Sequence, residues 1–310
     1  TPLYSSAASD VYKRQPWEYL YWKPDDRLAD DPEHFLALQE DVSLVRHAAI
    51  DFPLPRVGLP ESFRMVGALI EDPDASLQAL EHGYRGAWTQ EALRLDWLHA
   101  AGRGELESAL ENAADLFHFD GQVVMRDGQA ALVLKDGEPL AARDLARLLT
   151  TARVRLAVFG RCTAERGAFQ QACHDLAGEL IRRGLPAAVL GQFNLAEPAA
   201  RILARELARG VLAGEPVDAA LGNARRAIWQ QTGRFDWGSP LLYLRVEDGV
   251  LFPRGAAVGE YVAYVEHQNV YYVVSNVEQT IGTLEAGATV SGSTLSMGRA
   301  GSAGAAARGK

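Results

Sequence analysis

The sequence predicts an α/β domain in which helices cover both faces of a mostly parallel sheet. Two observations lead to this prediction. Short continuous apolar runs recur through residues 61–253, and helical patterns of roughly 10 to 16 residues separate them. Continuous apolar runs are typical of strands buried on both faces, and the helices between them supply the crossovers that parallel strands need.

Each element of this core has its own signal. Strands are predicted at the apolar runs, which cover residues 64–70, 114–119, 130–134, 154–159, 186–190 and 241–245. Helices are predicted where the apolar residues follow a helical spacing instead of a continuous run, at residues 77–88, 105–110, 142–149, 168–183, 198–213 and 217–230. Gly184 follows one of these helices as a C-cap residue, and Pro198 suits the first turn of the next.

The composition changes on both sides of this core. Residues 16–60 hold short apolar pieces among Pro and Asp, and we expect them to pack on its edge, so that the main domain covers residues 16–253. Residues 254–298 are predicted to form a β-rich extension, of which 261–297 would add strands or self-associate. Residues 299–310 are mainly Gly, Ala and Arg and are expected to be disordered.

The first residues differ from the rest of the chain. Residues 10–15, Asp-Val-Tyr-Lys-Arg-Gln, resemble a translated sequencing adapter, a familiar contaminant of assembled metagenomic reads. Residues 1–15 are therefore regarded as artefact or disordered sequence and play no part in the fold prediction. We expect the native protein to begin further upstream.

Composition narrows the function. The chain of 310 residues is 48% hydrophobic and 23% charged, with a formal net charge of -9, which disfavours general nucleic-acid binding. Two cysteines make no disulfide framework, so a reducing, cytoplasmic setting is expected. No apolar run approaches the ~20 residues that span a bilayer. Neither a zinc-ligand spacing nor a phosphate loop is present, so no metal and no cofactor are predicted.

Polar residues follow three of the predicted strands, and ligands of open parallel sheets gather at the carboxyl ends of strands. If those strands are neighbours, their ends face one crevice. The candidate site residues at the three ends are His118, Asp120, Gly121, Gln122, Arg161, Cys162, Gln192 and Asn194.

Cys162 has two possible interpretations. It lies between a strand and a helix, beside Arg161, and both surroundings favour a reactive thiolate. It is equally a small residue of the kind often buried at a strand end. Cys173 and His174 are neighbours on one helix and cannot face each other, so both are interpreted as structural. His118 lies in a buried strand pattern, where a hydrogen-bonded core histidine is more common than a base.

At these residues the sequence resembles CHAT-domain proteins, which are related to caspases and separases. The resemblance covers about residues 16–253 and implies a caspase-like fold. It rests on the order and spacing of short stretches at residues 16–20 (PWEYL), 35–38 (FLAL), 118–121 (HFDG), 158–164 (VFGRCTA), 184–189 (GLPAAV), 192–193 (QF) and 237–245 (WGSPLLYLR).

The resemblance also implies roles. The family pattern is His-Phe-x-Gly-His-Gly, whose second His is the base, and Asn-Ala-Cys, whose Cys is the nucleophile. Cys162 stands at the nucleophile position, but Gln122 and Val123 replace the His-Gly pair. A neutral amide exchanges no proton near neutral pH, and losing such a group costs about 10²–10⁴-fold in rate. His118 would lie about 13 Å back along an extended strand and is expected not to reach Cys162.

Three hypotheses follow. The first is a catalytically impaired CHAT domain, a pseudoenzyme that binds a peptide or protein partner as a scaffold or regulator. The second is an active cysteine endopeptidase that uses Cys162 with a non-standard base, supplied by His118 or another segment. The third, a Rossmann-type nucleotide binder, is the weakest, because no Gly-rich fingerprint follows the strand at residues 64–70.

Overall fold

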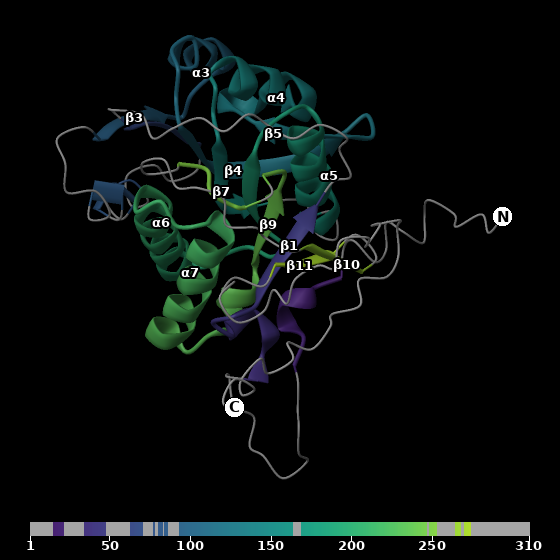
Figure 1. The fold of residues 1–310 in the computed structure, drawn as a ribbon. Coiled ribbons are helices and arrows are strands. Elements are labelled where there is room, and N and C mark those ends of the chain that lie inside the picture. Colours follow the sequence, from purple (N-terminus) through teal and green to yellow (C-terminus); the bar gives the residue numbers. More distant parts are fainter. Residues whose placement is uncertain are drawn as a thin grey trace, which may run out of the picture.

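The computed structural model contains one large sheet, with strand order β10-β11-β1-β9-β8-β7-β4-β2-β3 and with β5 and β6 joined to it through β4 (Figure 1). Predictions for residues 299–310, and for most of 1–15 and 254–298, lie outside the described residues. The structure describes residues 15–21, 34–47, 63–70, 77, 80–82, 84–85, 93–163, 169–246, 248–252, 264–267 and 270–273.

The elements have the following bounds. The strands are β1 (Ser43–His47), β2 (Phe63–Leu69), β3 (Leu93–His99), β4 (Leu116–Arg126), β5 (Gln129–Val133), β6 (Pro139–Ala141), β7 (Leu156–Thr163), β8 (Ala187–Gly191), β9 (Pro240–Leu244), β10 (Tyr264–His267) and β11 (Val270–Val273). The α-helices are α3 (Arg103–Ala109), α4 (Ala142–Thr151), α5 (Phe169–Arg182), α6 (Glu197–Leu212) and α7 (Val217–Thr232). The 3-10 helices are η1 (Trp17–Tyr19), η3 (Leu36–Leu38), η4 (Lys135–Gly137) and η5 (Phe235–Gly238).

The centre of the sheet is parallel. The neighbours β3, β2, β4, β7 and β8 all run in one direction, whereas β9 is antiparallel to β8. Strand β1 is parallel to β9, and the hairpin of β10 and β11 continues the sheet antiparallel to β1. The predicted α/β class is confirmed, with antiparallel pairing beyond β8 on one side of the parallel centre and in the β5 and β6 strands that branch from β4.

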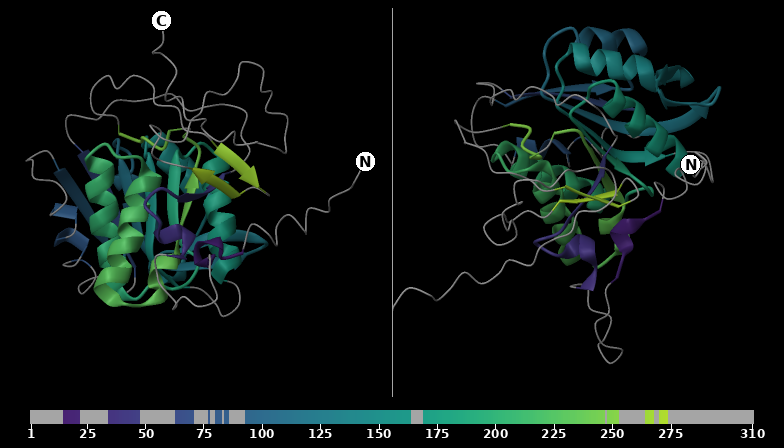
Figure 2. Two further views of the ribbon diagram at one scale, coloured as in Figure 1. Left: turned by 60° about the horizontal axis from the view of Figure 1, so that its bottom comes forward. Right: turned by 45° about the vertical axis from the view of Figure 1, so that its right-hand side comes forward.

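Two apolar cores lie on opposite faces of the sheet. Helices α3, α4 and α5 cover one face, and α6 and α7 cover the other (Figures 1 and 2). Side chains of β7 divide between them, because Leu156 and Val158 enter the α6 and α7 core while Ala157 and Phe159 enter the α4 and α5 core. This alternation is the period of two that a strand buried on both faces must show. No helix in the described ranges combines the length and apolar character needed to cross a bilayer.

The prediction for residues 114–119 was too short. Strand β4 continues past the expected end to Arg126 and then turns back into β5. The turn residues Asp127 and Gly128 both have positive φ, of 49° and 73°, which is the geometry of a tight hairpin. Gln122 therefore lies within a strand and not after its end.

Two strands were missed, β3 and the short β6 (Pro139–Ala141), of which β3 is the longer. Residues Leu93–His99 form β3, which pairs with β2 along its whole length at the rim of the sheet. Its sequence, LRLDWLH, mixes charged and apolar residues because a strand at the rim of the sheet is only partly covered. No continuous apolar run marked it.

Candidate functional site

The predicted nucleophile and base positions lie on adjacent parallel strands. In the register of β4 and β7, Gly121 is opposite Cys162 and Gln122 is opposite Thr163. The pairing is irregular between Phe119 and Gly121, and such an irregularity re-aims the side chains around it. Strand β8, whose end carries the third predicted polar group, is the other neighbour of β7. The three predicted strands are therefore neighbours in the order β8-β7-β4.

Cys162 is part of the apolar core under α4 and α5. Its side chain is 1% exposed and belongs to the cluster that also contains Phe119 and Val123. Because side chains alternate between faces, Gln122, next to Val123, is directed to the opposite face of the sheet. Adjacent strands thus bring residues 122 and 162 close in the backbone, but the register separates their side chains.

His118 is enclosed on the other face of β4. Its ring is fully buried, with Nε2 2.9 Å from Asp120 Oδ1 and Nδ1 3.0 Å from the Tyr84 hydroxyl. The rings of Tyr84 and Trp97 pack edge-on against the imidazole, with centroids 5.8 Å and 6.1 Å away. Burial and the charge of Asp120 raise the pKa of Tyr84 far above its usual range, so its hydroxyl keeps its proton. Both ring nitrogens are therefore already hydrogen-bonded.

Asp120 connects this histidine to β7, the strand that carries Cys162. Its Oδ1 also accepts a hydrogen bond of 2.8 Å from the backbone N–H of Arg161, the residue before Cys162. Its Oδ2 is buried and has no hydrogen-bond partner among the described residues. Gly160 makes this packing possible, since a Cβ there would lie 2.6 Å from Oδ1 and 3.0 Å from the His118 ring. The carboxylate thus fixes both the imidazole and the backbone entering position 162.

Gln192 points into a buried ionic group and not into an open crevice. Its Nε2 donates to Glu18 Oε2 at 3.1 Å and to the Gly238 carbonyl at 2.7 Å. Glu18 in turn forms an ion pair of 3.0 Å with Arg46, and both side chains are less than a tenth exposed. This group ties the N-terminal segment to the ends of β8 and β1.

Sequence reasoning missed the ionic group as well as Tyr84 and Trp97. Arg46 stands inside an apolar strand, and Arg225 stands on the buried face of α7. A cation in such a pattern is a signal that a buried partner exists, because buried charges are nearly always paired or hydrogen-bonded. Arg225 donates to the Pro240 carbonyl at 2.7 Å, and burial lowers its pKa to about 10.

Asn194 lines a surface pocket just beyond β8. The pocket has a volume of about 470 Å³ and is lined by Tyr19, Phe193, Asn194, Gly233, Arg234, Phe235, Asp236 and Ser239. Phe193 is 41% exposed and Phe235 is 58% exposed, so two aromatic rings border it in contact with solvent. Burial and the charge of Asp236 raise the pKa of Tyr19 to about 12, so its hydroxyl is a neutral donor there.

The remaining candidates have structural surroundings. Cys173 is buried in α5, and burial alone raises the pKa of its thiol to about 12. His174 Nδ1 lies 2.6 Å from the Tyr243 hydroxyl, on the neighbouring strand β9. Within the described ranges, His, Cys, Asp and Glu side chains form no group of three or more that could hold a metal ion.

Comparison with known proteins gives one family and several distant structures. The profile of the CHAT domain matches residues 3–245. No curated protein matches the sequence. Solved structures of similar fold include the Arg-specific cysteine proteinase gingipain R of Porphyromonas gingivalis, at 10% identity and a TM-score of 0.44, covering 68% of this chain and 52% of that one. The chain thus spans about half the length of the gingipain structure.

Two further structures are similar at lower scores. They are separase in its complex with securin from Saccharomyces cerevisiae, at 11% identity and a TM-score of 0.38, and the Drosophila initiator caspase Dronc, at 8% and 0.36. The separase match covers 61% of this chain and 12% of that one, and the Dronc match covers 75% and 99%.

Proposed function

The chain belongs to the CHAT domain family, and from this premise we propose that it is a catalytically impaired peptidase homologue that binds a peptide or protein partner. The caspase-like peptidase family uses a cysteine nucleophile with a histidine base. In this chain the corresponding positions are Cys162 and Gln122. The role that remains is that of a scaffold or regulator.

One observation carries the proposal: the Cys162 side chain is packed in an apolar core, 1% exposed, on the face of the sheet away from Gln122. A nucleophilic thiol needs access to substrate and a nearby group that accepts its proton. The cluster around the Cys162 side chain is apolar and closely packed, which leaves a substrate little access to the sulfur. An amide at position 122 supplies no proton acceptor even if it reached the sulfur.

Partner binding is supported by the aromatic pocket beyond β8, described above. Phe193 and Phe235 are two of the three large hydrophobic side chains that the described residues expose, and both border this pocket. Exposed aromatic surface beside polar groups is typical of peptide and protein recognition sites. The pocket follows the strand next to β7, so a peptide bound there would lie along the carboxyl ends of the strands.

The first experiment tests catalysis. Purified wild-type protein and Cys162→Ala protein are incubated with an unbiased peptide library, and the products are identified by mass spectrometry. We expect the same peptides in both samples. Cleavage that occurs with wild-type protein and disappears with Cys162→Ala would overturn the proposal.

The second experiment tests binding. A displayed peptide library is selected on the wild-type protein, and each enriched peptide is measured against Phe193→Ala and Phe235→Ala. Leu20→Ala is the matched control, because Leu20 is 40% exposed but is not among the residues that line the pocket. We expect about tenfold weaker binding in the two pocket variants and no change in the control.

An active endopeptidase is the second candidate, and the His118–Asp120 pair favours it. A carboxylate that orients an imidazole is the usual second half of a cysteine or serine nucleophile system. Here the carboxylate also holds the backbone next to Cys162. This candidate requires His118 to leave its enclosed position, so fast labelling of Cys162 at neutral pH, lost in His118→Ala, would support it.

The setting of the protein is also a proposal. Cys162 and Cys173 are both buried, and no disulfide joins them. Two cysteines that form no disulfide support a reducing, cytoplasmic environment.

A further inference from the structure

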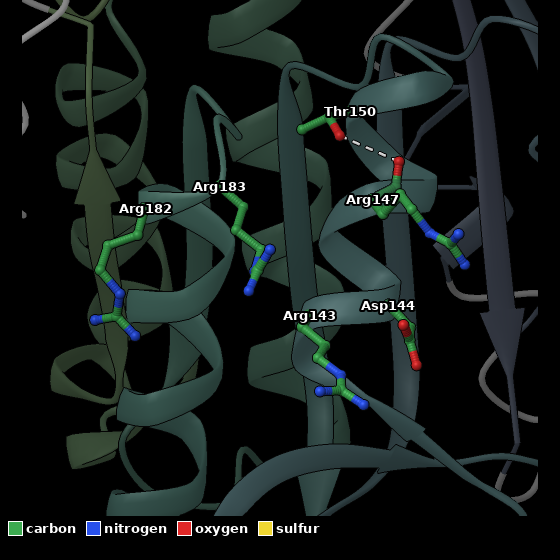
Figure 3. Close-up of a pocket in the computed structure, with 6 residues that line it drawn as sticks. All are labelled: Arg143, Asp144, Arg147, Thr150, Arg182 and Arg183. Carbon is green, nitrogen blue, oxygen red and sulfur yellow. Dashed lines mark hydrogen bonds between the residues drawn. The ribbon is translucent and has the colours of Figure 1, made fainter.

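A second pocket lies between α4 and α5, on the far side of the sheet from α6 and α7. Its volume is about 570 Å³, and four of its six lining side chains are arginines (Figure 3). The only acidic side chain in this lining is Asp144. Such a concentration of positive charge is unexpected in a chain whose formal net charge is -9. The lining residues are Arg143, Asp144, Arg147, Thr150, Arg182 and Arg183.

The arginines of α4 are electrostatically unfavourable for their own helix. Arg143, Arg147 and Thr150 are spaced i, i+4 and i+7, which puts them on one face. Arg143 lies in the first turn, where the positive end of the helix dipole disfavours a cation. Like charges four residues apart also repel each other. In the described part of the chain neither Arg143 nor Arg147 has an acidic partner.

The arginines of α5 are partly neutralised. Arg182 and Arg183 both pair with Glu179, and they are 60% and 51% exposed. Figure 3 shows the Arg183 guanidinium in the space between the two helices and the Arg143 guanidinium below the first turn of α4, whereas the Arg182 and Arg147 side chains extend away from that space on the outer sides of α5 and α4. Asp144 is 3.9 Å from Arg103 at the edge of the pocket, so it leaves the centre positively charged.

We propose that this arginine pocket binds an acidic segment of a partner protein through the carboxylates of its Asp or Glu side chains. Guanidinium groups bind carboxylates with two parallel hydrogen bonds, and a carboxylate between α4 and α5 would relieve the repulsion among the arginines. The proposal is independent of the function proposed above, because the two pockets share no residue and lie over different elements.

The pocket fits an acidic peptide better than a nucleic acid or a membrane. It has no aromatic lining on which bases could stack, and the net negative charge of the chain repels a long polyanion that extends beyond the pocket. The large hydrophobic side chains exposed in the described residues, Leu20, Phe193 and Phe235, lie outside its lining, so none is available here to enter a lipid surface.

The test is titration of the full chain with a fluorescent octaglutamate peptide, followed by anisotropy at about 0.1 M and about 1 M salt. We expect binding at low salt that the double variant Arg143→Glu/Arg147→Glu weakens by about tenfold or more. Arg201→Glu/Arg209→Glu is the matched control, since it reverses the charge of two exposed arginines on α6, and unlike Arg143 and Arg147 these two have acidic helix partners. We expect it to bind as the wild type does.

Two further measurements separate a loss of binding from a loss of folding and from simple charge attraction. The thermal midpoint of Arg143→Glu/Arg147→Glu should equal or exceed that of the wild type, because Glu suits the first turn of a helix. Arg143→Lys/Arg147→Lys keeps the charge but not the two-bond fork, and it should bind with intermediate affinity. The proposal is overturned by no binding to the wild type, by equal weakening in Arg201→Glu/Arg209→Glu, or by equally tight binding of a single-stranded RNA oligonucleotide.

Discussion

Two of the buried polar groups that the structure describes at this sheet are built in different ways. The His118 group consists of Tyr84, His118 and Asp120, and the Glu18 group consists of Glu18, Arg46 and Gln192. In the His118 group the residues that can form an ion pair, His118 and Asp120, lie on one strand. In the Glu18 group the ion pair joins Glu18 and Arg46, which are 28 residues apart in the sequence.

The two groups differ in what they hold in place. The His118 group touches the backbone next to Cys162, so its alteration changes the geometry of the candidate site. The Glu18 group joins the N-terminal segment to the ends of two strands, and Gln192 reaches a residue 174 positions away to do so. We therefore infer that the Glu18 group stabilises the fold and that the His118 group shapes the site. The predictions below test that division.

The largest effect is expected in the Glu18 group. Glu18→Ala leaves Arg46 as a buried cation without its carboxylate, which costs about 3–5 kcal/mol of the free energy of unfolding. Urea unfolding measures this. Glu197→Ala removes the exposed carboxylate paired with Arg201 at 3.7 Å and should stay within about 1 kcal/mol of the wild type. Equal losses in both variants would show that the Glu18 group is no more important than a surface pair.

A smaller loss is expected in the His118 group. Asp120→Ala removes the acceptor for His118 Nε2 and for the Arg161 N–H, and leaving buried donors unpaired costs about 1–3 kcal/mol. The same variant should increase the rate at which a thiol reagent reaches Cys162, because the backbone before it is released. Asp120→Asn keeps one acceptor oxygen and should lose less on both measures. A stability loss with no change in Cys162 labelling would contradict the link to the site.

Burial of the Cys173 thiol predicts that the stability of the protein depends on pH. Its pKa rises from 9.0 to about 12 in the fold, so the folded state retains a proton that the unfolded state releases above pH 9. The stability from the neutral thiol is therefore complete below pH 9 and is lost as pH rises toward 12. The loss amounts to about 1.4 kcal/mol per pH unit in that window.

Comparison with Cys173→Ala isolates that loss. Between pH 9 and pH 10.5 the wild type should lose stability faster than the variant, as measured by urea unfolding at each pH. Parallel curves for the two proteins would mean that the thiol is not desolvated in the native state, contrary to its 2% exposure.

The smallest effect is expected from Tyr84→Phe. The ring and its packing against His118 remain, and only the hydroxyl that meets Nδ1 at 3.0 Å is removed. We expect a loss of about 1 kcal/mol, measured by urea unfolding. An unchanged rate of Cys162 labelling would agree with the division drawn above, since Asp120 still holds the Arg161 N–H. A loss of stability as large as that of Glu18→Ala would contradict the expectation that the Glu18 group contributes more to stability than the His118 group.

The sequence determined the fold class, since continuous apolar runs separated by helical patterns allow few arrangements other than a parallel sheet covered on both faces. Strands β2, β7 and β8 were located within a few residues for that reason. Strand β3 was missed and β4 was cut short. A rim strand lacks a continuous apolar run, and the Asp127–Gly128 turn was not used to extend the strand before it.

Only the tertiary structure decided which side chains meet. The sequence placed Gln122 and Cys162 at neighbouring strands, but a shift of one residue in register moves a side chain to the other face. The irregularity between Phe119 and Gly121 determines that register, and no local sequence pattern predicts it. The partners Tyr84 of His118 and Glu18 of Gln192 come from distant segments of the chain. No local sequence pattern identifies such partners, because tertiary packing brings them together.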